Sequence, residues 1–385
     1  MKKKVCQFIN RLTGVSLIKL VISAGFPYHK DPLSYEWIWV FIMLPFMEEE
    51  SLADLTLKHG SELKKLYIIL NRHPESFEKL LHLMSIPVFV KLIREFDLSN
   101  ETEKSRRRIR IIVDDTKSEK FGKHMEFIHK MFDHAKKRYI TGYNYIFVIA
   151  ASGDMVFPLS SVLWLPKTHP DHRSRNDIAA DEILRLKTAC ECRGCSIEET
   201  EILSDSAYCV QKVVKSSENA GFCVITKVGN THKFQVGDEH LTPRQIIEKV
   251  KNMQWKHPEP CHCCQRVSAF HHNYGTVILT VRSRELNSGK IVYDVLMCTK
   301  TFINSVRIHK SYKKRWEIET HFKYYKQYLG LGKSQVRKSG SVRSCLSAAA
   351  IAGLIVNLFR QTFFRKMSFR SAVRLIQKRI CTWQC

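Results

Sequence analysis

Residues 106–220 alternate strand and helix patterns, and this order restricts their fold to the α/β class. The pattern opens with a β-branched, alternating segment, IRIIVDD, which predicts a strand that ends on two carboxylates. Gly153 and Asp154 then separate two long strand patterns, which predicts a hairpin. The expected elements are a strand at 109–115, hairpin strands at 143–152 and 155–165, a helix at about 176–192, a strand at 201–205 and a helix that ends near 219. We therefore expect an α/β core that begins with antiparallel pairing.

The regions on either side of this core have different patterns. Apolar residues at three- and four-residue spacing predict helices over about 33–97, with breaks at Pro74 and Pro87. Residues 221–300 are mostly strand-like, apart from a helical patch near 243–253, and two helices are expected between 304 and 360. The predicted divisions are a helical domain at 1–105, the first part of the α/β core at 106–220, a mostly β insertion at 221–303, the second part of the core at 304–360 and a basic helical tail at 361–385.

The charge of the chain predicts a polyanionic partner. It contains 62 Lys and Arg residues against 37 Asp and Glu residues, which gives a formal net charge of +25. Such an excess destabilises a compact protein through self-repulsion unless an anion compensates it. Residues 1–30 and 361–385 carry basic residues and no acidic ones. We therefore expect nucleic acid as the partner, in preference to a basic surface that serves only solubility.

The cysteines and the apolar segments indicate a reducing compartment and no membrane span. The 13 cysteines are odd in number and lack the spaced pairs of a secreted disulfide framework. The Cys and His residues between 257 and 272 lack the Cys-x2-Cys pairing of common zinc sites, so we do not expect structural zinc. The apolar stretch 348–359 contains Asn357 and is shorter than the ~20 residues that cross a bilayer.

A polar row in residues 311–329 is the strongest functional signal. On a helix, Tyr312, Arg315, Glu319 and Lys326 fall within ~60° of one another. An apolar stripe lies beside them and would hold the polar row at the edge of a cleft; it consists of Ile318, Phe322, Tyr325 and Leu329. The row spans ~21 Å, so only part of it can reach one reacting atom. A metal-binding acid beside groups that grip successive phosphates fits this length, and the alternative is a solvated charged face.

The row Tyr-x2-Arg-x3-Glu-x6-Lys, with Arg-Trp-x-Ile-Glu at its centre, resembles the signature of the D-D-E transposases of bacterial insertion sequences. The nearest group is insertion-sequence family four and its relatives. In that family the first Asp ends a strand and precedes Thr, which matches Asp115, and the second follows a short apolar strand, which matches Asp205. The resemblance covers about residues 106–335. It implies a ribonuclease-H-like catalytic core that is interrupted by a β insertion and preceded along the chain by a helical DNA-binding domain.

Asp114 competes with Asp115 for the first acidic position. On a strand, Asp114 shares a face with Arg110 and Ile112, whereas Asp115 shares a face with the apolar Ile109, Ile111 and Val113. Only the Thr that follows favours Asp115. Both assignments therefore stay open, with Asp115 as the expected one.

The resemblance implies a cut-and-paste DNA transposase in which Asp115, Asp205 and Glu319 are catalytic residues and metal ligands. Such a site holds two Mg²⁺ ions, for which Mn²⁺ substitutes. Tyr312, Arg315 and Lys326 would bind DNA phosphates near the cut. An aromatic residue of the insertion would receive a displaced base, and the unassigned candidates for it are Trp255 and Tyr293.

The same resemblance implies double-stranded DNA as the partner, both as terminal inverted repeats and as target, and a homodimer in the DNA complex. The expected location is the bacterial cytoplasm, in association with the nucleoid. Two other functions compete with this one: a catalytically inactive DNA-binding descendant, and a plain metal-dependent nuclease that cuts DNA without joining ends.

Overall fold

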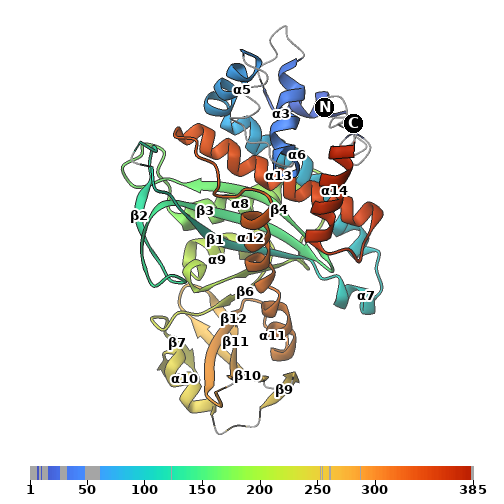
Figure 1. The fold of residues 1–385 in the computed structure, drawn as a ribbon. Coiled ribbons are helices and arrows are strands. Elements are labelled where there is room, and N and C mark those ends of the chain that lie inside the picture. Colours follow the sequence, from blue (N-terminus) through green and yellow to red (C-terminus); the bar gives the residue numbers. More distant parts are fainter. Residues whose placement is uncertain are drawn as a thin grey trace.

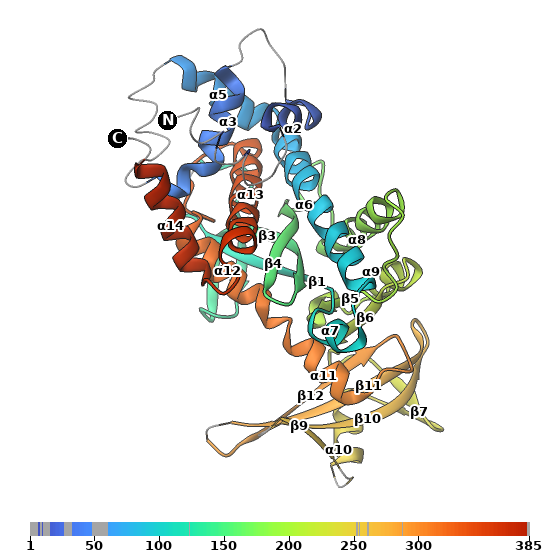
Figure 2. The same cartoon turned by 90° about the vertical axis from the view of Figure 1, so that its right-hand side faces the viewer.

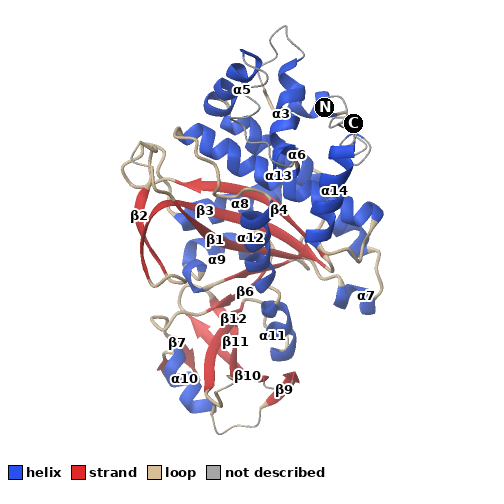
Figure 3. Ribbon diagram, viewed as in Figure 1, coloured by secondary structure: helices blue, strands red, loops and turns tan. Residues whose placement is uncertain are grey.

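The computed structural model describes residues 7, 10, 16–26, 33–47, 61–122, 124–251, 253, 255–259, 262–286 and 288–382. Figures 1 and 3 show a large mixed sheet with helices packed against it. The first part of the chain forms α2 (Leu17–Ser23), α3 (Leu33–Met43), a 3-10 turn η1 (Leu44–Phe46), α5 (Ser61–Arg72), α6 (Pro74–Asp97) and α7 (Glu101–Arg106). The α/β region follows with β1 (Arg110–Glu119), β2 (His129–Asp133), β3 (Arg138–Ser152), β4 (Met155–Trp164), α8 (Arg175–Glu191), β5 (Glu201–Ser204), η2 (Ser206–Tyr208), α9 (Gln211–Asn219) and β6 (Cys223–Lys227).

The second half of the chain completes the sheet and then returns to helices. Its β-rich part contains β7 (Phe234–Val236), β8 (Glu239–Leu241), α10 (Pro243–Val250), β9 (Lys256–Glu259), β10 (His262–His271), β11 (Gly275–Glu285) and β12 (Ile291–Cys298). The final helices are α11 (Ser305–Lys313), α12 (Trp316–Tyr328), α13 (Ser339–Phe363) and α14 (Phe369–Thr382). In Figure 1 the β-rich part lies below the α/β region, and α11 and α12 lead back up to it.

The strand order places β1 in the interior of the sheet. Strands run in the order β2-β3-β1-β5-β6-β12-β11-β10-β7-β8, with β4 paired to β3 and β9 paired to β10. β1 pairs antiparallel with β3 and parallel with β5, which in turn pairs parallel with β6. The predicted α/β class with an antiparallel start is therefore confirmed. A separate apolar cluster, which includes Val224, Phe234, Val281 and Met297, forms a small core for the β-rich part.

Several local expectations were wrong. β1 does not end on its two carboxylates but continues to Glu119, because Thr116–Glu119 pairs with Tyr145–Gly142 of β3. α6 runs through Pro87 without ending there, and its two flanks are buried against α13 and β4. Tertiary packing thus outweighs the backbone hydrogen bond that the proline removes.

The predicted basic helical tail contains α14, which packs against the rest of the protein. Phe369, Ala372, Val373 and Ile376 recur at helical spacing and are all buried, so α14 presents an apolar face to the rest of the protein. It contacts α13, α12 and η1, and Figure 2 shows it beside α13. α13 is long and apolar enough to cross a membrane by length and composition, but most of it is buried against β4, α6 and α5, as expected for a core helix.

Candidate active site

Asp114 and Asp205 lie next to each other, just beyond the end of the parallel ladder between β1 and β5. The β1–β5 register runs to Val113 opposite Ser204, and the two acids are the next residues on each chain. Residues at the same level of adjacent parallel strands project to the same face, so the two carboxylates share a face of the sheet. Asp205 also caps η2, because its Oδ1 accepts the N–H of Ala207 at 2.8 Å.

The neighbours of each side chain separate Asp114 from Asp115. Asp114 stands opposite Phe147 of β3, whose ring lies 5.4 Å from the ring of Phe322 on α12. Asp115 projects to the other face of the sheet. Its Oδ1 accepts hydrogen bonds from the guanidinium of Arg175 at 3.0 Å and from the hydroxyl of Tyr208 at 3.3 Å. The face with Asp205 and α12 therefore carries Asp114, whereas the sequence favours Asp115.

Arg315 joins the first acid to Glu319. Its Nη1 donates to Asp114 Oδ2 at 2.8 Å, and its Nη2 donates to Glu319 Oε1 at 2.7 Å. The segment 311–329, expected as one helix, is two helices with Lys314 and Arg315 in a tight turn between them. In this turn Arg315 N–H donates to the carbonyl of Tyr312, a three-residue spacing that winds the chain more tightly than an α-helix. The apolar stripe predicted beside the polar row is confirmed as buried: Ile318, Phe322, Tyr325 and Leu329.

The electrostatics of Asp114 indicate a site with more negative than positive charge. The pKa of Asp114 is raised from 3.8 to about 7, mainly by burial and also by the nearby Asp205, while Arg315 opposes the rise. The carboxylates of Asp114 and Asp205 are adjacent, and the guanidinium of Arg315 bonds to Asp114 and to Glu319, so the acidic oxygens have more acceptor capacity than this one guanidinium satisfies. Hard divalent cations take such oxygen ligands, so the donor chemistry fits Mg²⁺. Within the described ranges, however, no three His, Cys, Asp or Glu side chains converge closely enough to hold one ion, because Arg315 stands between Asp114 and Glu319.

Tyr312 extends the polar row toward the β-rich part. Its ring lies 5.9 Å from the guanidinium carbon of Arg315 and 5.0 Å from that of Arg282 on β11. Arg282 is held by two hydrogen bonds to Asp294 of β12, from Nε at 2.7 Å and from Nη2 at 2.6 Å. Burial raises the pKa of the Tyr312 hydroxyl, so the group remains protonated at neutral pH.

Lys326 marks the far end of the row. Its Nζ donates to the backbone carbonyl of Lys117 at 3.0 Å. Lys117 follows Asp114 by three residues on β1, which corresponds to ~10 Å along a strand. Burial lowers the pKa of Lys326. The structure thus brings Arg315 and Glu319 together with Asp114 and places Tyr312 beside Arg315. Lys326, on α12, contacts β1 three residues beyond Asp114.

Sequence reasoning missed the residues that hold these groups in place. Arg282 and Asp294 occupy directly opposite positions on β11 and β12, so their pairing depends on a register that no local motif specifies. Arg175 and Tyr208 lie far from Asp115 in sequence and meet it only through the fold. The two aromatic candidates in the insertion, Trp255 and Tyr293, lie close together, with ring centroids 6.2 Å apart.

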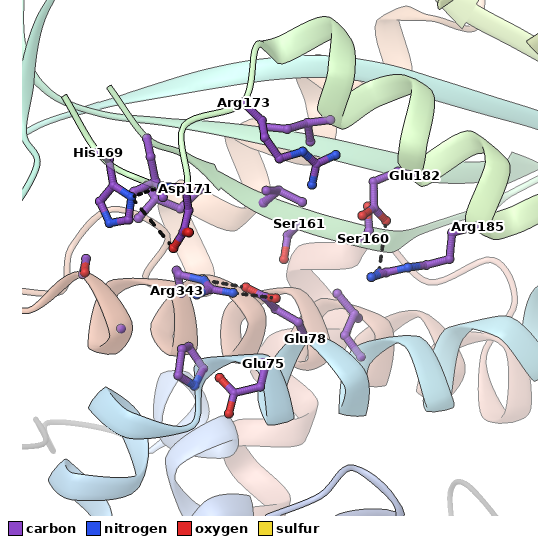
Figure 4. Close-up of a pocket in the computed structure, with 18 of the residues that line it drawn as sticks. Glu75, Glu78, Ser160, Ser161, His169, Asp171, Arg173, Glu182, Arg185 and Arg343 are labelled. Carbon is purple, nitrogen blue, oxygen red and sulfur yellow. Dashed lines mark hydrogen bonds and ion pairs between the residues drawn. The ribbon is translucent and has the colours of Figure 1, made fainter. Parts of the chain in front are cut away.

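A separate cavity of about 550 Å³ lies between α6, β4, α8 and α13 and does not include the acidic residues described above. Figure 4 shows that its charged side chains point toward one another across the space. Arg343 binds Glu78 at 2.9 Å, and Arg185 binds Glu182 at 3.4 Å. The Arg343–Glu78 pair joins α13 to α6, whereas Arg185 and Glu182 are both on α8. We do not take this cavity as the active site.

The comparison with protein families identifies the chain. The family described as "Transposase DDE domain" matches residues 105–354, which is more than half of the chain and includes Asp114, Asp205 and Glu319. The chain therefore belongs to this transposase family. No curated protein matches it significantly.

Proposed function

We propose that this protein is a DNA transposase that binds the ends of an insertion sequence, cuts them and joins them to target DNA. The observation that carries the proposal is the arrangement of Asp114 beside Asp205, with Arg315 linking Asp114 to Glu319. Further support comes from the strand order β4-β3-β1-β5-β6, with β1, β5 and β6 parallel, which is the order expected of a ribonuclease-H-like core. The β-rich part at 221–303 then corresponds to the insertion, and insertion-sequence family four remains the nearest proposed group.

We assign the first acidic position to Asp114. The reason is the face of the sheet: Asp114 shares a face with Asp205 and α12, while Asp115 is engaged by Arg175 and Tyr208 on the other face. Asp115 then has a supporting role, in which it anchors the start of α8 and the η2 turn to β1. The catalytic set in this proposal is Asp114, Asp205 and Glu319.

Two divalent ions, Mg²⁺ or Mn²⁺, would be held by these three carboxylates and would activate the attacking oxygen and stabilise the leaving one. In the absence of DNA, the single guanidinium of Arg315 bonds to both Asp114 and Glu319. Its planar guanidinium suits two oxygens of a phosphate equally well. Arg315 would therefore exchange a carboxylate for a DNA phosphate as the substrate enters, which releases Glu319 toward Asp114.

The remaining residues of the row bind and orient the DNA. Lys326 offers an ammonium ~10 Å along β1 from Asp114, a distance of about three phosphates along one strand. Tyr312 keeps its proton and can donate a hydrogen bond to a phosphate oxygen next to Arg315. The helical N-terminal region would read the end sequence, and two copies of the chain would assemble on a pair of ends.

The proposal is tested on DNA ends taken from the inverted repeats that flank the reading frame. Wild-type protein with Mg²⁺ or Mn²⁺ should cut at the end and join the 3′-hydroxyl to a target duplex, with little activity in Ca²⁺, which does not impose octahedral geometry. Asp205→Asn and Glu319→Gln should abolish both steps and leave end binding within about threefold, because binding depends on basic residues.

Asp181→Asn is the matched control, because Asp181 is an acid on α8 that pairs with Arg173 away from the site. It should retain activity. Equal nicking of unrelated DNA with no joined product would indicate a plain nuclease. End binding without any cutting by wild-type protein would indicate an inactive descendant.

A further inference from the structure

The sheet face that carries Asp114 continues beyond the helices that cover it. Asp114 stands opposite Phe147, and alternation along β3 places Tyr143, Thr141 and Tyr139 on the same face as Phe147. Phe147 and Tyr143 are fully buried, whereas Thr141 is exposed and Tyr139 is 62% exposed. The covering therefore ends between Tyr143 and Tyr139, where β3 pairs with β2 at the margin of the sheet (Figure 1).

The uncovered end of this face combines aromatic rings with lysines. Phe132 stands opposite Tyr139, and their rings lie 5.3 Å apart, while the ammonium of Lys130 lies 5.0 Å from the Tyr139 ring. The turn at 134–137 adds Lys137 and is ordered by the Asp133 side chain, which accepts the N–H groups of Ala135 and Lys136. We call Lys130, Phe132 and Tyr139, together with Lys137 from the adjoining turn, the hairpin face.

The charges on the hairpin are only partly compensated. Lys136 and Arg138 both pair with Glu119, whereas among the described residues no acid lies within ion-pair distance of Lys130 or Lys137. Lysines on an edge strand can serve only to prevent pairing with other sheets. That explanation does not require a pair of exposed aromatic rings on the same face. Rings next to unpaired ammonium groups are the combination that proteins use to bind nucleic acid backbones and bases.

The hairpin also continues the polar row of the active site. Lys326 contacts β1 at Lys117, and burial lowers the pKa of its ammonium, on which the charges of Asp133, Lys136 and Lys117 also act. The path from Glu319 past Lys326 thus leads to the β2–β3 hairpin. From Phe147 to Tyr139 the strand advances eight residues, which is ~27 Å or about eight base pairs of duplex.

We propose that the hairpin face is a second binding site for the duplex of the transposon end, in which Lys130 and Lys137 contact phosphates about eight base pairs from the cut and Tyr139 packs against the backbone between them. This inference rests on the proposed function. It assigns to the hairpin the task of fixing the direction in which the duplex leaves the active site.

The test measures end binding by fluorescence anisotropy over a range of salt concentrations. Lys130→Ala and Lys137→Asn should each lower the slope of log affinity against log salt by about one, because each lysine releases condensed counterion from one phosphate. Asparagine is chosen for Lys137 because the backbone there has φ of 52°, which asparagine tolerates. Lys187→Ala is the control: it removes an equal charge from α8, whose first residue contacts Asp115 on the opposite face, and it should leave the slope unchanged.

A second measurement locates the contact on DNA. Neutral methylphosphonates placed one at a time at 5 to 12 base pairs from the cut should weaken wild-type binding most at about position eight. The same substitutions should cost the Lys130→Ala, Lys137→Asn variant nothing further. Additive losses in the variant would show that the hairpin contacts no phosphate there and would overturn the inference.

The outcomes distinguish the two proposals. Unchanged salt slopes in hairpin variants of a protein that cuts and joins ends would overturn the inference alone. A change of sedimentation coefficient without a change in DNA binding would assign the hairpin to contact between copies of the chain, and would overturn it as well. Wild-type protein that neither binds nor cuts ends would overturn the proposed function and the inference together.

Discussion

Replacing Asp114 and Asp115 one at a time by Asn tests which acid belongs to the active site without any DNA. Burial holds the pKa of Asp114 at about 7 against an ordinary value of 3.8. The folded protein therefore keeps this proton between about pH 4 and pH 7, where the unfolded chain has lost it. The free energy of unfolding falls as the pH rises through this interval, and the loss is complete above about pH 7. Its size corresponds to about 4 kcal/mol.

An asparagine at position 114 cannot ionise, so Asp114→Asn escapes this loss. The attraction of Arg315 for the carboxylate is already included in the raised pKa of Asp114, so it offsets nothing further. We expect a stabilisation of about 4 kcal/mol at pH 8 in the absence of metal, and much less at pH 4.5. Asp115→Asn should instead destabilise the protein by about 1–3 kcal/mol at pH 8, because it weakens the bonds to Arg175 and Tyr208.

The assay is thermal denaturation in EDTA at the two pH values, followed by a titration with Mg²⁺. Wild-type protein and Asp115→Asn should gain stability from Mg²⁺, and Asp114→Asn should gain little, because it lacks a ligand. A stabilised Asp115→Asn that no longer responds to Mg²⁺, beside a responsive Asp114→Asn, would refute the assignment and restore the position that the following Thr favours.

Three further predictions concern the supports of the site. The double variant Arg282→Asp, Asp294→Arg should restore the thermal stability that Arg282→Asp alone loses. It should not restore the cleavage rate, because the swapped pair no longer places a guanidinium 5.0 Å from the ring of Tyr312. Full recovery of cleavage would show that only the ion pair matters. Lys326→Ala should lower the cleavage rate about 100-fold while end binding changes less, because small misplacements of the phosphate slow the chemistry; equal losses in rate and affinity would assign Lys326 to binding alone. Removal of residues 361–385 should lower the unfolding temperature, because burial of Phe369, Val373 and Ile376 in α14 contributes about 1.5–3 kcal/mol each. The double variant Arg370→Ala, Arg374→Ala should keep the fold. An unchanged melting temperature after truncation would contradict the packing of α14.

Local patterns predict the helices and strands of the site well, but they predict poorly on which face of the sheet each residue lies. The strand before Asp205 and the apolar stripe of α12 follow from periodicity, and both occur as expected. The choice between Asp114 and Asp115 does not, because a strand interior to a sheet is buried on both faces and either residue could be the inward one. What decides it is that Phe147 stands opposite Asp114 and lies under α12. α12 is more than 150 residues away in sequence, so no window around the acids contains this information.

The same limit explains the error at Pro87 and why the packing of the tail is not predicted. A proline in a helical pattern predicts a break because the local cost is clear, yet α6 keeps its course because α13 and β4 bury its sides. The basic residues of 361–385 predict a helical tail but not its packing, although Phe369, Ala372, Val373 and Ile376 repeat at helical spacing within it. In both segments a partner that is distant in sequence supplies the deciding free energy.

The β-rich part contributes side chains to the site and is not merely carried by the core. Asp294 fixes Arg282, Arg282 lies over Tyr312, and Tyr312 faces Arg315, which binds Asp114 and Glu319. The series runs from β12 to β11, from β11 to α11, and from α11 to the turn before α12. A shift of β11 against β12 would therefore move the guanidinium that stands between the first and third acids. In the proposed function that guanidinium exchanges a carboxylate for a phosphate before Glu319 approaches Asp114, so DNA that engages the β-rich part would act on the assembly of the proposed catalytic acids through Tyr312.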